Sequence, residues 1–271
     1  MFKFAIEGGV VVDFIIYVPI FIVGLIIGSF ANVCIYRIPK GESINFPPSH
    51  CQACKHKLGF LDLFPVLSYF GLKGKCRYCG TKISPQYAII ELVNGCAYAY
   101  SFWHFGMSIE AMLACVFVTV VLILTLIDWR YMILPTGIII FGSMVAIAGK
   151  STLAYLHQDW SILIQSLLGG MVGYGVVALV FYLCLWILKK EGMGYGDVRY
   201  LGMIGLFTSP SLVFLTLLIG SVVGSIYGLV LYRRNKESLE FPFGPFLSIG
   251  ALISLFYGES LISWYMNLWM V

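Results

Sequence analysis

The sequence contains few charged residues for its length. Of its 271 residues only 11% are Asp, Glu, Lys or Arg, whereas 60% are hydrophobic. A soluble domain covers its surface with far more charge, typically about a quarter of its residues. The composition therefore excludes a soluble enzyme or a soluble binding module and indicates an integral membrane protein.

Apolar runs of helical length occur along most of the chain. The first run is too long for the ~7–15-residue apolar region of a cleavable secretory signal, so we expect it to remain as a membrane helix. The run at 198–209 is shorter than the ~20 residues that cross a bilayer, which predicts a half-helix or a tilted element. The predicted fold is an all-α polytopic membrane protein with about eight transmembrane helices, at 12–36, 86–105, 108–127, 132–149, 161–188, 198–209, 211–232 and 242–268.

Basic residues are concentrated in a few loops. If the predicted helices alternate in direction, 15 of the 17 Lys and Arg residues lie on one face of the membrane, and only Lys3 and Lys150 lie elsewhere. Loops rich in Lys and Arg face the cytoplasm, so both termini are expected outside. No basic stripe with interleaved aromatic residues indicates a nucleic-acid partner. The lipid bilayer is the expected surrounding.

A polar and basic insertion separates the first two predicted helices. It divides the chain into a first transmembrane helix (1–36), a small cytoplasmic domain (37–85) and a transmembrane core (86–271). A domain as small as 37–85 usually needs a metal, disulfides or a partner to remain folded.

The insertion carries two Cys-x-x-Cys pairs separated by 21 residues, formed by Cys51, Cys54, Cys76 and Cys79. Two such pairs can place four thiolates tetrahedrally around Zn²⁺. We therefore expect a zinc site, with reduced thiols or a redox pair as the alternative. Four cysteine ligands leave no open position for water, so the expected role of the zinc is structural.

Two aspartates lie at the predicted cytoplasmic edges of membrane helices. Asp128 follows an unbroken apolar run, and Asp197 directly precedes the short predicted span. Acidic groups beside membrane helices are costly and are candidates for function. The alternative is a helix cap or an ion pair with Arg130 or Arg199. Two carboxylates a few ångström apart share one proton, so that one activates water while the other donates to the substrate carbonyl.

No other set of residues competes as a catalytic centre, because the sequence has no Ser-His-Asp order and no Cys with a suitable His partner. Gly194 and Gly196 directly precede Asp197 and suit a loop that a substrate backbone approaches closely. The predicted catalytic pair is therefore Asp128 and Asp197.

Several sequence blocks together resemble one family. The stretch Glu191-Gly-Met-Gly-Tyr-Gly-Asp197-Val-Arg resembles the signature of bacterial type IV prepilin peptidases, which belong to the Gly-x-Gly-Asp class of intramembrane aspartic proteases. The resemblance extends over most of the chain, through Gly28-Ser-Phe-Ala-Asn32-Val, Arg37-Ile-Pro-Lys-Gly-Glu42-Ser, Pro47-Pro-Ser-His-Cys51, Asp62-Leu-Phe-Pro-Val-Leu-Ser68, Gly74-Lys-Cys-Arg77 and Phe241-Pro-Phe-Gly244-Pro-Phe-Leu.

The resemblance implies an activity, a substrate and a second cofactor. Prepilin peptidases of bacterial inner membranes cut type IV prepilins and type II secretion pseudopilins after a Gly that ends a short, basic, cytoplasmic leader. Members with a four-Cys domain also N-methylate the new amino terminus with S-adenosylmethionine, so we expect this activity too. The chain has no Rossmann glycine fingerprint. The candidate residues for the cofactor site are Asn32, Arg37, Glu42, Glu91 and Gly95.

Two positions depart from the family pattern. Thr136 stands where the family has the Asp of Leu-Pro-Asp, and Arg199 stands where the family often has Lys. Neither departure changes a predicted catalytic carboxylate. Two other classes of protein remain open: a transporter, whose acidic residues would lie near the membrane midplane, and a non-catalytic scaffold of a pilus or secretion machine, which would not need both aspartates.

Overall fold

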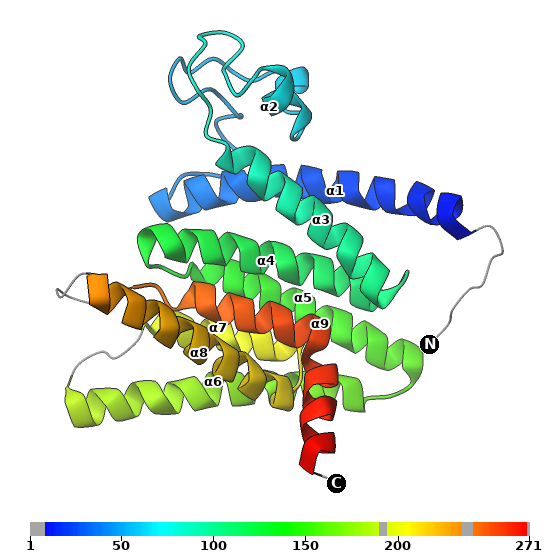
Figure 1. Ribbon diagram of the computed structural model, residues 1–271, viewed down its shortest axis with the longest axis vertical. Helices are drawn as coiled ribbons and strands as arrows, with labels where there is room; N and C mark the ends of the chain where they lie inside the picture. Colours follow the sequence, from blue (N-terminus) through cyan, green and yellow to red (C-terminus); the bar gives the residue numbers. More distant parts are fainter. Residues whose placement is uncertain (1–8, 190–193, 235–240, 270–271) are drawn as a thin grey trace. The chain divides into compact units, whose positions relative to one another are not determined.

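The computed structural model describes residues 9–189, 194–234 and 241–269. These residues form helices joined by loops, with two isolated β-bridges and no longer strand pairing among them (Figure 1). The chain divides into two compact units, residues 1–115 (unit 1) and 116–271 (unit 2). The helices are α1 (Gly9–Arg37), α2 (Leu67–Gly71), α3 (Gln86–Phe105), α4 (Ile109–Tyr131), α5 (Thr136–His157), α6 (Ser161–Leu188), α7 (Tyr195–Phe207), α8 (Pro210–Arg234) and α9 (Gly244–Trp269), with 3-10 turns η1 (Ile38–Lys40) and η2 (Phe60–Asp62).

The prediction of an all-helical membrane protein is confirmed, and a long or short helix occupies each of the eight predicted positions. Within the described residues, however, only six helices are long and apolar enough to cross a membrane: α1, α4, α5, α6, α8 and α9. The 13 residues of α7 span about 20 Å, well short of a ~30 Å hydrocarbon core. Helix α3 is less apolar because it buries Glu91 and Asn94. By length and composition, six of the eight predicted positions are thus candidate membrane spans, and α3 and α7 occupy the other two.

In unit 1, α1 packs along α3, and small residues permit the close approach. A Cβ on Gly28 would lie 2.8 Å from the Cα of Glu91, and a Cβ on Gly95 would collide with side chains of α1. The side-chain amide of Asn94 donates a hydrogen bond of 2.7 Å to the carbonyl of Gly24. In a membrane the hydrophobic effect does not drive helices together, because lipid tails are as apolar as the side chains. Close packing at small residues and hydrogen bonds between helices stabilise such contacts instead.

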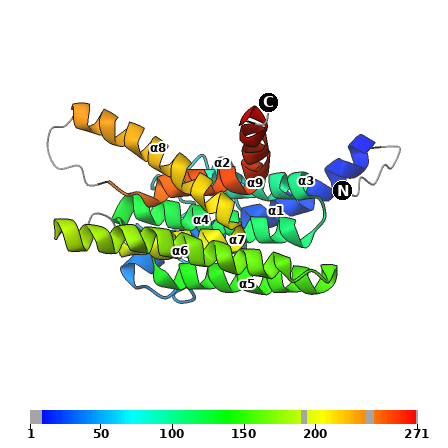
Figure 2. The same ribbon diagram turned by 90° about the horizontal axis from the view of Figure 1, so that it is seen from below.

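In unit 2, the short helix α7 lies against the longer helix α6 (Figure 2). The two backbones nearly touch, because a Cβ on Gly173 would lie 2.5 Å from the carbonyl of Leu201, and Gly169 faces Gly205 with no room for a side chain. Helix α7 is consequently buried along most of its length, including its first-turn residue Asp197. A helix too short to cross a bilayer is tolerated here because protein surrounds its backbone.

Candidate functional site

Asp128 and Asp197 belong to different helices of unit 2, and both are buried. Asp128 lies in the last turn of α4, and Asp197 lies in the first turn of α7. They expose 5% and 6% of their surface, respectively. The carboxylates are close enough that the charge of Asp128 acts directly on Asp197. The structure thus brings together the two aspartates that the sequence predicted as a pair.

Each carboxylate of this pair lies near the N-terminus of a helix. Asp197 occupies the first turn of its own helix, whose N-cap is Gly194. Asp128 lies at the C-terminal end of α4, where the helix dipole disfavours negative charge. The backbone N–H of Gly244, the first residue of α9, donates to Asp128 Oδ2 at 3.0 Å. The first N–H groups of a helix have no partner inside it, so α9 provides the donor that α4 cannot.

Gly244 also leaves no space for a side chain. A Cβ at this position would lie 2.6 Å from Asp128 Oδ2. The sequence placed Gly244 in a C-terminal block shared with a family but assigned it no role. The following residue, Pro245, is a signal for a helix start, because proline is favoured in the first helical turn. Pro245 thus predicts that the N–H of Gly244 has no partner within the helix. It does not predict that the carboxylate of Asp128 accepts a hydrogen bond from this N–H.

Three hydroxyl side chains form a network one turn deeper in the same helices. Thr125 Oγ1 donates to Ser248 Oγ at 2.7 Å, and the Tyr200 hydroxyl lies 2.7 Å from the same oxygen. Ser248 Oγ in turn donates to the carbonyl of Gly244 at 2.8 Å. Tyr200 is fully buried, and both aspartates act on its hydroxyl. This hydroxyl network (Thr125, Tyr200 and Ser248) links α4, α7 and α9, the helices that hold the pair of aspartates, and the sequence did not predict it.

The glycines that precede Asp197 differ in their surroundings. Gly194 is exposed, and a Cβ on it would lie 3.4 Å from Asp197 Oδ2. Gly196 is half-buried, and a Cβ on it would lie 3.0 Å from the Cβ of Leu134, so little space remains there. Glu191, which begins the signature, lies outside the described residues. An exposed glycine beside a buried carboxylate is consistent with the predicted approach of a substrate backbone from this side.

Thr136 and Arg199, the two positions that depart from the family pattern, contact each other. Arg199 Nη1 donates to Thr136 Oγ1, and the guanidinium lies 4.8 Å from the ring centroid of Tyr195. Arg199 therefore does not form the ion pair with Asp197 that was the alternative explanation for this aspartate. The backbone N–H of Asp197 donates to the carbonyl of Gly194 at 3.0 Å, within its own turn.

In unit 1, the two Cys-x-x-Cys pairs form two copies of the same turn. The residue after the second cysteine, Lys55 or Gly80, has a positive φ of 58° or 71°. Its N–H donates to the carbonyl of the first cysteine at 2.9 Å in both copies. In both, the N–H of the first cysteine donates at 2.9 Å to the carbonyl five residues later. The repeated turn brings the Sγ atoms of Cys51, Cys54, Cys76 and Cys79 within 4.8 Å of one another.

The geometry of this cysteine cluster fits a tetrahedral metal. A Zn–S bond of about 2.3 Å places the sulfurs of a tetrahedron about 3.8 Å apart. The Sγ atoms of Cys51 and Cys79 lie 3.8 Å apart. Hydrogen bonding with Thr81 lowers the pKa of Cys79 to about 6, which favours the thiolate that binds metals. The cysteine cluster can therefore hold a metal ion.

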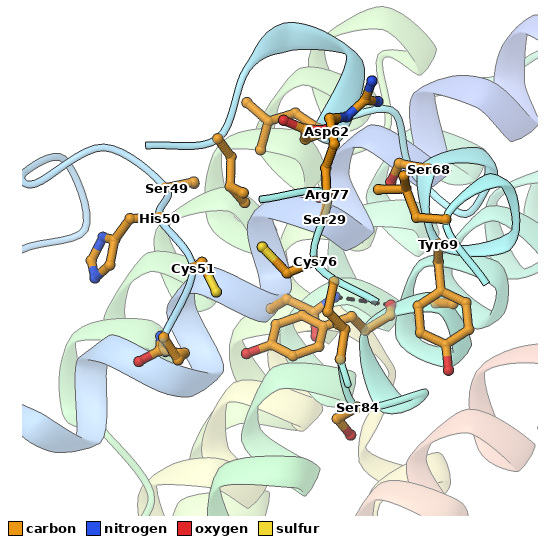
Figure 3. A pocket seen from close by; sticks show the side chains of 18 of the residues that line it. Ser29, Ser49, His50, Cys51, Asp62, Ser68, Tyr69, Cys76, Arg77 and Ser84 are labelled. Atoms are coloured by element: carbon orange, nitrogen blue, oxygen red, sulfur yellow. Dashed lines mark hydrogen bonds and ion pairs between the residues drawn. The ribbon is translucent and has the colours of Figure 1, made fainter. Parts of the chain in front are cut away.

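A cavity of about 410 Å³ lies in unit 1 beside the cysteine cluster, and Figure 3 shows Cys51 and Cys76 at its border. Asn32 and Arg37 of α1 and Glu91 of α3 also line it. Its volume falls within the ~300–1,000 Å³ of small-molecule sites. Three of the five residues predicted for a cofactor site thus surround one cavity.

The other two predicted cofactor residues lie apart from the cavity lining. Glu42 is exposed, and its backbone N–H donates to the carbonyl of Arg37. Gly95 is buried in the contact between α1 and α3. Arg37 itself donates to loop carbonyls, including those of Ser43 at 2.9 Å and Pro47 at 2.7 Å, which fixes the start of the insertion.

Comparisons with known proteins agree with this arrangement. Residues 22–105 match the Bacterial Peptidase A24 N-terminal domain, and residues 115–229 match the Type IV leader peptidase family. Proteins named "Prepilin leader peptidase/N-methyltransferase" match along almost their whole length. The relative from Stutzerimonas stutzeri is 30% identical (91% of this chain, 92% of the relative), that from Bacillus subtilis (strain 168) is 32% identical (92% and 97%), and that from Legionella pneumophila is 28% identical (94% and 96%). No solved structure matches the chain. The chain belongs to the type IV leader peptidase family.

Proposed function

We propose that this protein is an aspartic endopeptidase that removes the short basic leader from type IV prepilins and related pseudopilins. We propose further that it N-methylates the new amino terminus. The observation that carries the first proposal is the pair of buried carboxylates, Asp128 and Asp197, held within electrostatic reach of each other at the ends of two helices. The names of the relatives support both activities.

The proposed cleavage uses the two aspartates and one water molecule. Two adjacent carboxylates share a proton, because both cannot ionise at this separation. The ionised member takes a proton from the water, whose oxygen attacks the carbonyl carbon of the Gly that ends the leader. The protonated member donates to the developing oxyanion. The C–N bond of the tetrahedral intermediate then breaks, and the amine of the following residue takes a proton from the aspartate pair and leaves. Water adds directly, so no acyl-enzyme forms. The two aspartates titrate as a unit, so the shared proton belongs to the pair and not to one residue.

The substrate is proposed to reach the pair along the glycine turn before α7. Gly194 is exposed next to Asp197 and has no side chain of its own, which favours the approach of an extended peptide to this carboxylate. The basic loops favour the cytoplasmic side of a bacterial inner membrane for this edge, with both termini outside. A prepilin presents its leader on that same side, while its apolar segment remains in the bilayer.

The cysteine cluster is proposed to bind a structural Zn²⁺. Four thiolates with tetrahedral spacing fill the coordination shell, so the ion has no position for a reacting water. Its binding free energy would stabilise the insertion 37–85, which has little core of its own. The metal is thus expected to support the cavity beside it and to have no direct role in cleavage.

The cavity in unit 1 is proposed to hold S-adenosylmethionine, which would supply an activated methyl group. Asn32 and Glu91 line the cavity, and Arg37 holds the loop that forms part of its wall. Glu42 and Gly95 would contribute indirectly, through the loop that follows α1 and through the packing of α1 on α3. The volume of about 410 Å³ suits a ligand of this size.

The test of the peptidase proposal uses purified full-length enzyme in detergent with a prepilin that carries a Gly-Phe junction. Wild type should cleave it, whereas Asp128→Asn and Asp197→Asn should each lower the cleavage rate by at least about a thousandfold, because either change removes the shared proton site. Thermal unfolding checks that both variants remain folded. Unchanged cleavage by a folded variant would show that its aspartate is not catalytic.

A further inference from the structure

Glu91 provides a buried carboxylate in the wall of the cavity in unit 1. It lies in α3, exposes 7% of its surface and lines the cavity. The side chain of Ser29, which Figure 3 shows at the same cavity, hydrogen-bonds to it. Hydrogen bonds and a positive partner favour the charged form of a carboxylate removed from water in this way.

One hydrogen bond to Glu91 comes from an unusual turn. Val66 has φ 62° and ψ −51°, and the N–H of Leu67 donates to the carbonyl of Pro65 at 2.6 Å. These values describe a γ-turn of the rare form, which is strained for a β-branched residue. The turn directs the N–H of Val66 to Glu91 Oε2 at 2.7 Å. Strained backbone persists where the surrounding structure holds it, frequently at functional sites.

Both arginines in the cavity wall already have other partners. Arg77 Nε pairs with Asp62 Oδ1 at 2.7 Å, and Asp62 also accepts bonds from Gly59 and Tyr78. Arg37 directs its guanidinium to loop carbonyls. Within the described part of the chain, no cationic side chain pairs with Glu91. The described contacts of Glu91 are hydrogen bonds. The cavity beside the carboxylate has room for a positively charged partner.

The wall around Glu91 includes apolar side chains of both helices beside the polar Ser29 and Asn32. Ala88 precedes Glu91 by one turn of α3, and Val33 follows Ser29 by one turn of α1, so each pair lies on one helix face. Both Ala88 and Val33 line the cavity. A cation that enters here meets a carboxylate with aliphatic side chains beside it. The N-terminal ammonium of a hydrophobic peptide has this combination of charge and apolar surface.

We infer that Glu91 binds the new N-terminal ammonium of the cleaved pilin and accepts a proton from it, an inference that rests on the proposed methyl transfer. The ammonium gives one proton to the carboxylate and becomes a neutral amine. The nitrogen lone pair of the amine then forms the N–C bond to the methyl group as the C–S bond breaks and its electrons remain on sulfur. The secondary ammonium that results leaves, and Glu91 releases its proton to solvent.

A binding experiment tests this role without requiring turnover. Full-length enzyme in detergent is titrated with a short Phe-first peptide that has a free amino terminus and with the same peptide acetylated, and both affinities are measured by calorimetry. The variant is Glu91→Gln, which keeps an acceptor for Val66 N–H but removes the charge. The control is Glu110→Gln, which neutralises a carboxylate of unit 1 outside the cavity lining.

Wild type and the control should bind the free-amine peptide about tenfold or more tightly than the acetylated one, because the contact is charge-assisted. Glu91→Gln should bind the two peptides equally. An unchanged preference in folded Glu91→Gln would overturn the inference, as would the same loss in the control. Zinc content and thermal unfolding report folding of each variant.

Two further measurements distinguish this inference from the proposal on which it rests. The affinity of wild type for the free-amine peptide should fall as pH rises through about 8, where an α-amino group loses its proton. The affinity for the acetylated peptide should not change with pH. An equal pH response of both peptides would overturn the inference even if the variant misfolded. Methyl transfer to the pre-cleaved peptide is then measured with wild type. Transfer by wild type with no amine preference would refute the role of Glu91 alone, whereas no transfer would refute the methyltransferase proposal itself.

Discussion

Substitution of Gly244 by Ala tests whether the α9 N-terminus positions the proposed catalytic pair, Asp128 and Asp197. The backbone tolerates the change, because Gly244 is not among the described residues with a positive φ. The new Cβ would lie 2.6 Å from Asp128 Oδ2, whereas ordinary contacts begin at 3.4 Å. The carboxylate and the start of α9 must therefore separate by about 0.8 Å, which lengthens the 3.0 Å hydrogen bond from the Gly244 N–H well beyond its useful range.

The size of the effect follows from that hydrogen bond and from the displacement. A hydrogen bond to a charged group contributes about 1.5–3 kcal/mol, and each 1.4 kcal/mol corresponds to about a tenfold change in rate. A displacement of about 1 Å at a reacting group costs on the order of a hundredfold. We therefore expect Gly244→Ala to lower kcat for leader cleavage by about 10- to 100-fold with a smaller change in KM.

The assay compares kcat and KM for Gly244→Ala, wild type and Gly175→Ala on one prepilin. Gly175 lies in α6, where a Cβ would meet nothing within 4 Å, so its replacement should leave kcat unchanged. Thermal unfolding in detergent checks that Gly244→Ala retains its fold. Wild-type kcat in a folded Gly244→Ala enzyme would refute the assignment of Gly244 as a positioning residue for Asp128.

Two other predictions concern parts of the structure that support the sites. Tyr200→Phe removes a buried hydroxyl 2.7 Å from Ser248, so the free energy of unfolding should fall by about 0.5–1.5 kcal/mol; an unchanged unfolding midpoint would mean that the hydroxyl network does not join the helices. Cys79→Ser should lower the zinc content from about one ion per chain to near zero and expose 37–85 to proteolysis, since the proposed zinc would stabilise this small domain. Metal analysis and limited proteolysis check the outcome, and a full zinc content would contradict the four-cysteine site.

The helices could be predicted because their signal is local. Helix α6 begins at Ser161 and ends at Leu188, the same bounds as the predicted span, because a polar connection precedes it and lysines follow it. The burial of helix α7 could not be predicted in this way, because it depends on the helices packed against it. Nothing within Tyr195–Phe207 states that glycines of α6 will approach its backbone, and this contact is what shelters a helix too short to cross the membrane.

The residues of the sites differ in the same way. Asp128 and Asp197 stand out because charge is rare in apolar surroundings, and the cysteines stand out by their spacing. Tyr200 and Ser248, in contrast, are ordinary residues of apolar helices, and their meaning comes from contacts between distant segments. Val66 gives still less indication, because a β-branched residue is among the last expected at a positive φ.

The position of Asp128 explains its contact with Gly244 in the C-terminal block, more than a hundred positions later in the chain. A buried carboxylate at the C-terminal end of a helix is opposed both by desolvation and by the helix dipole. Asp197 avoids the second cost, because it lies in the first turn of α7. Asp128 can carry charge only if another helix N-terminus faces it, and α9 begins with a glycine at that point because any side chain would occupy the space of the carboxylate. If the pair must ionise, as the proposed cleavage requires, the glycine of α9 and the closeness of three helix ends both follow.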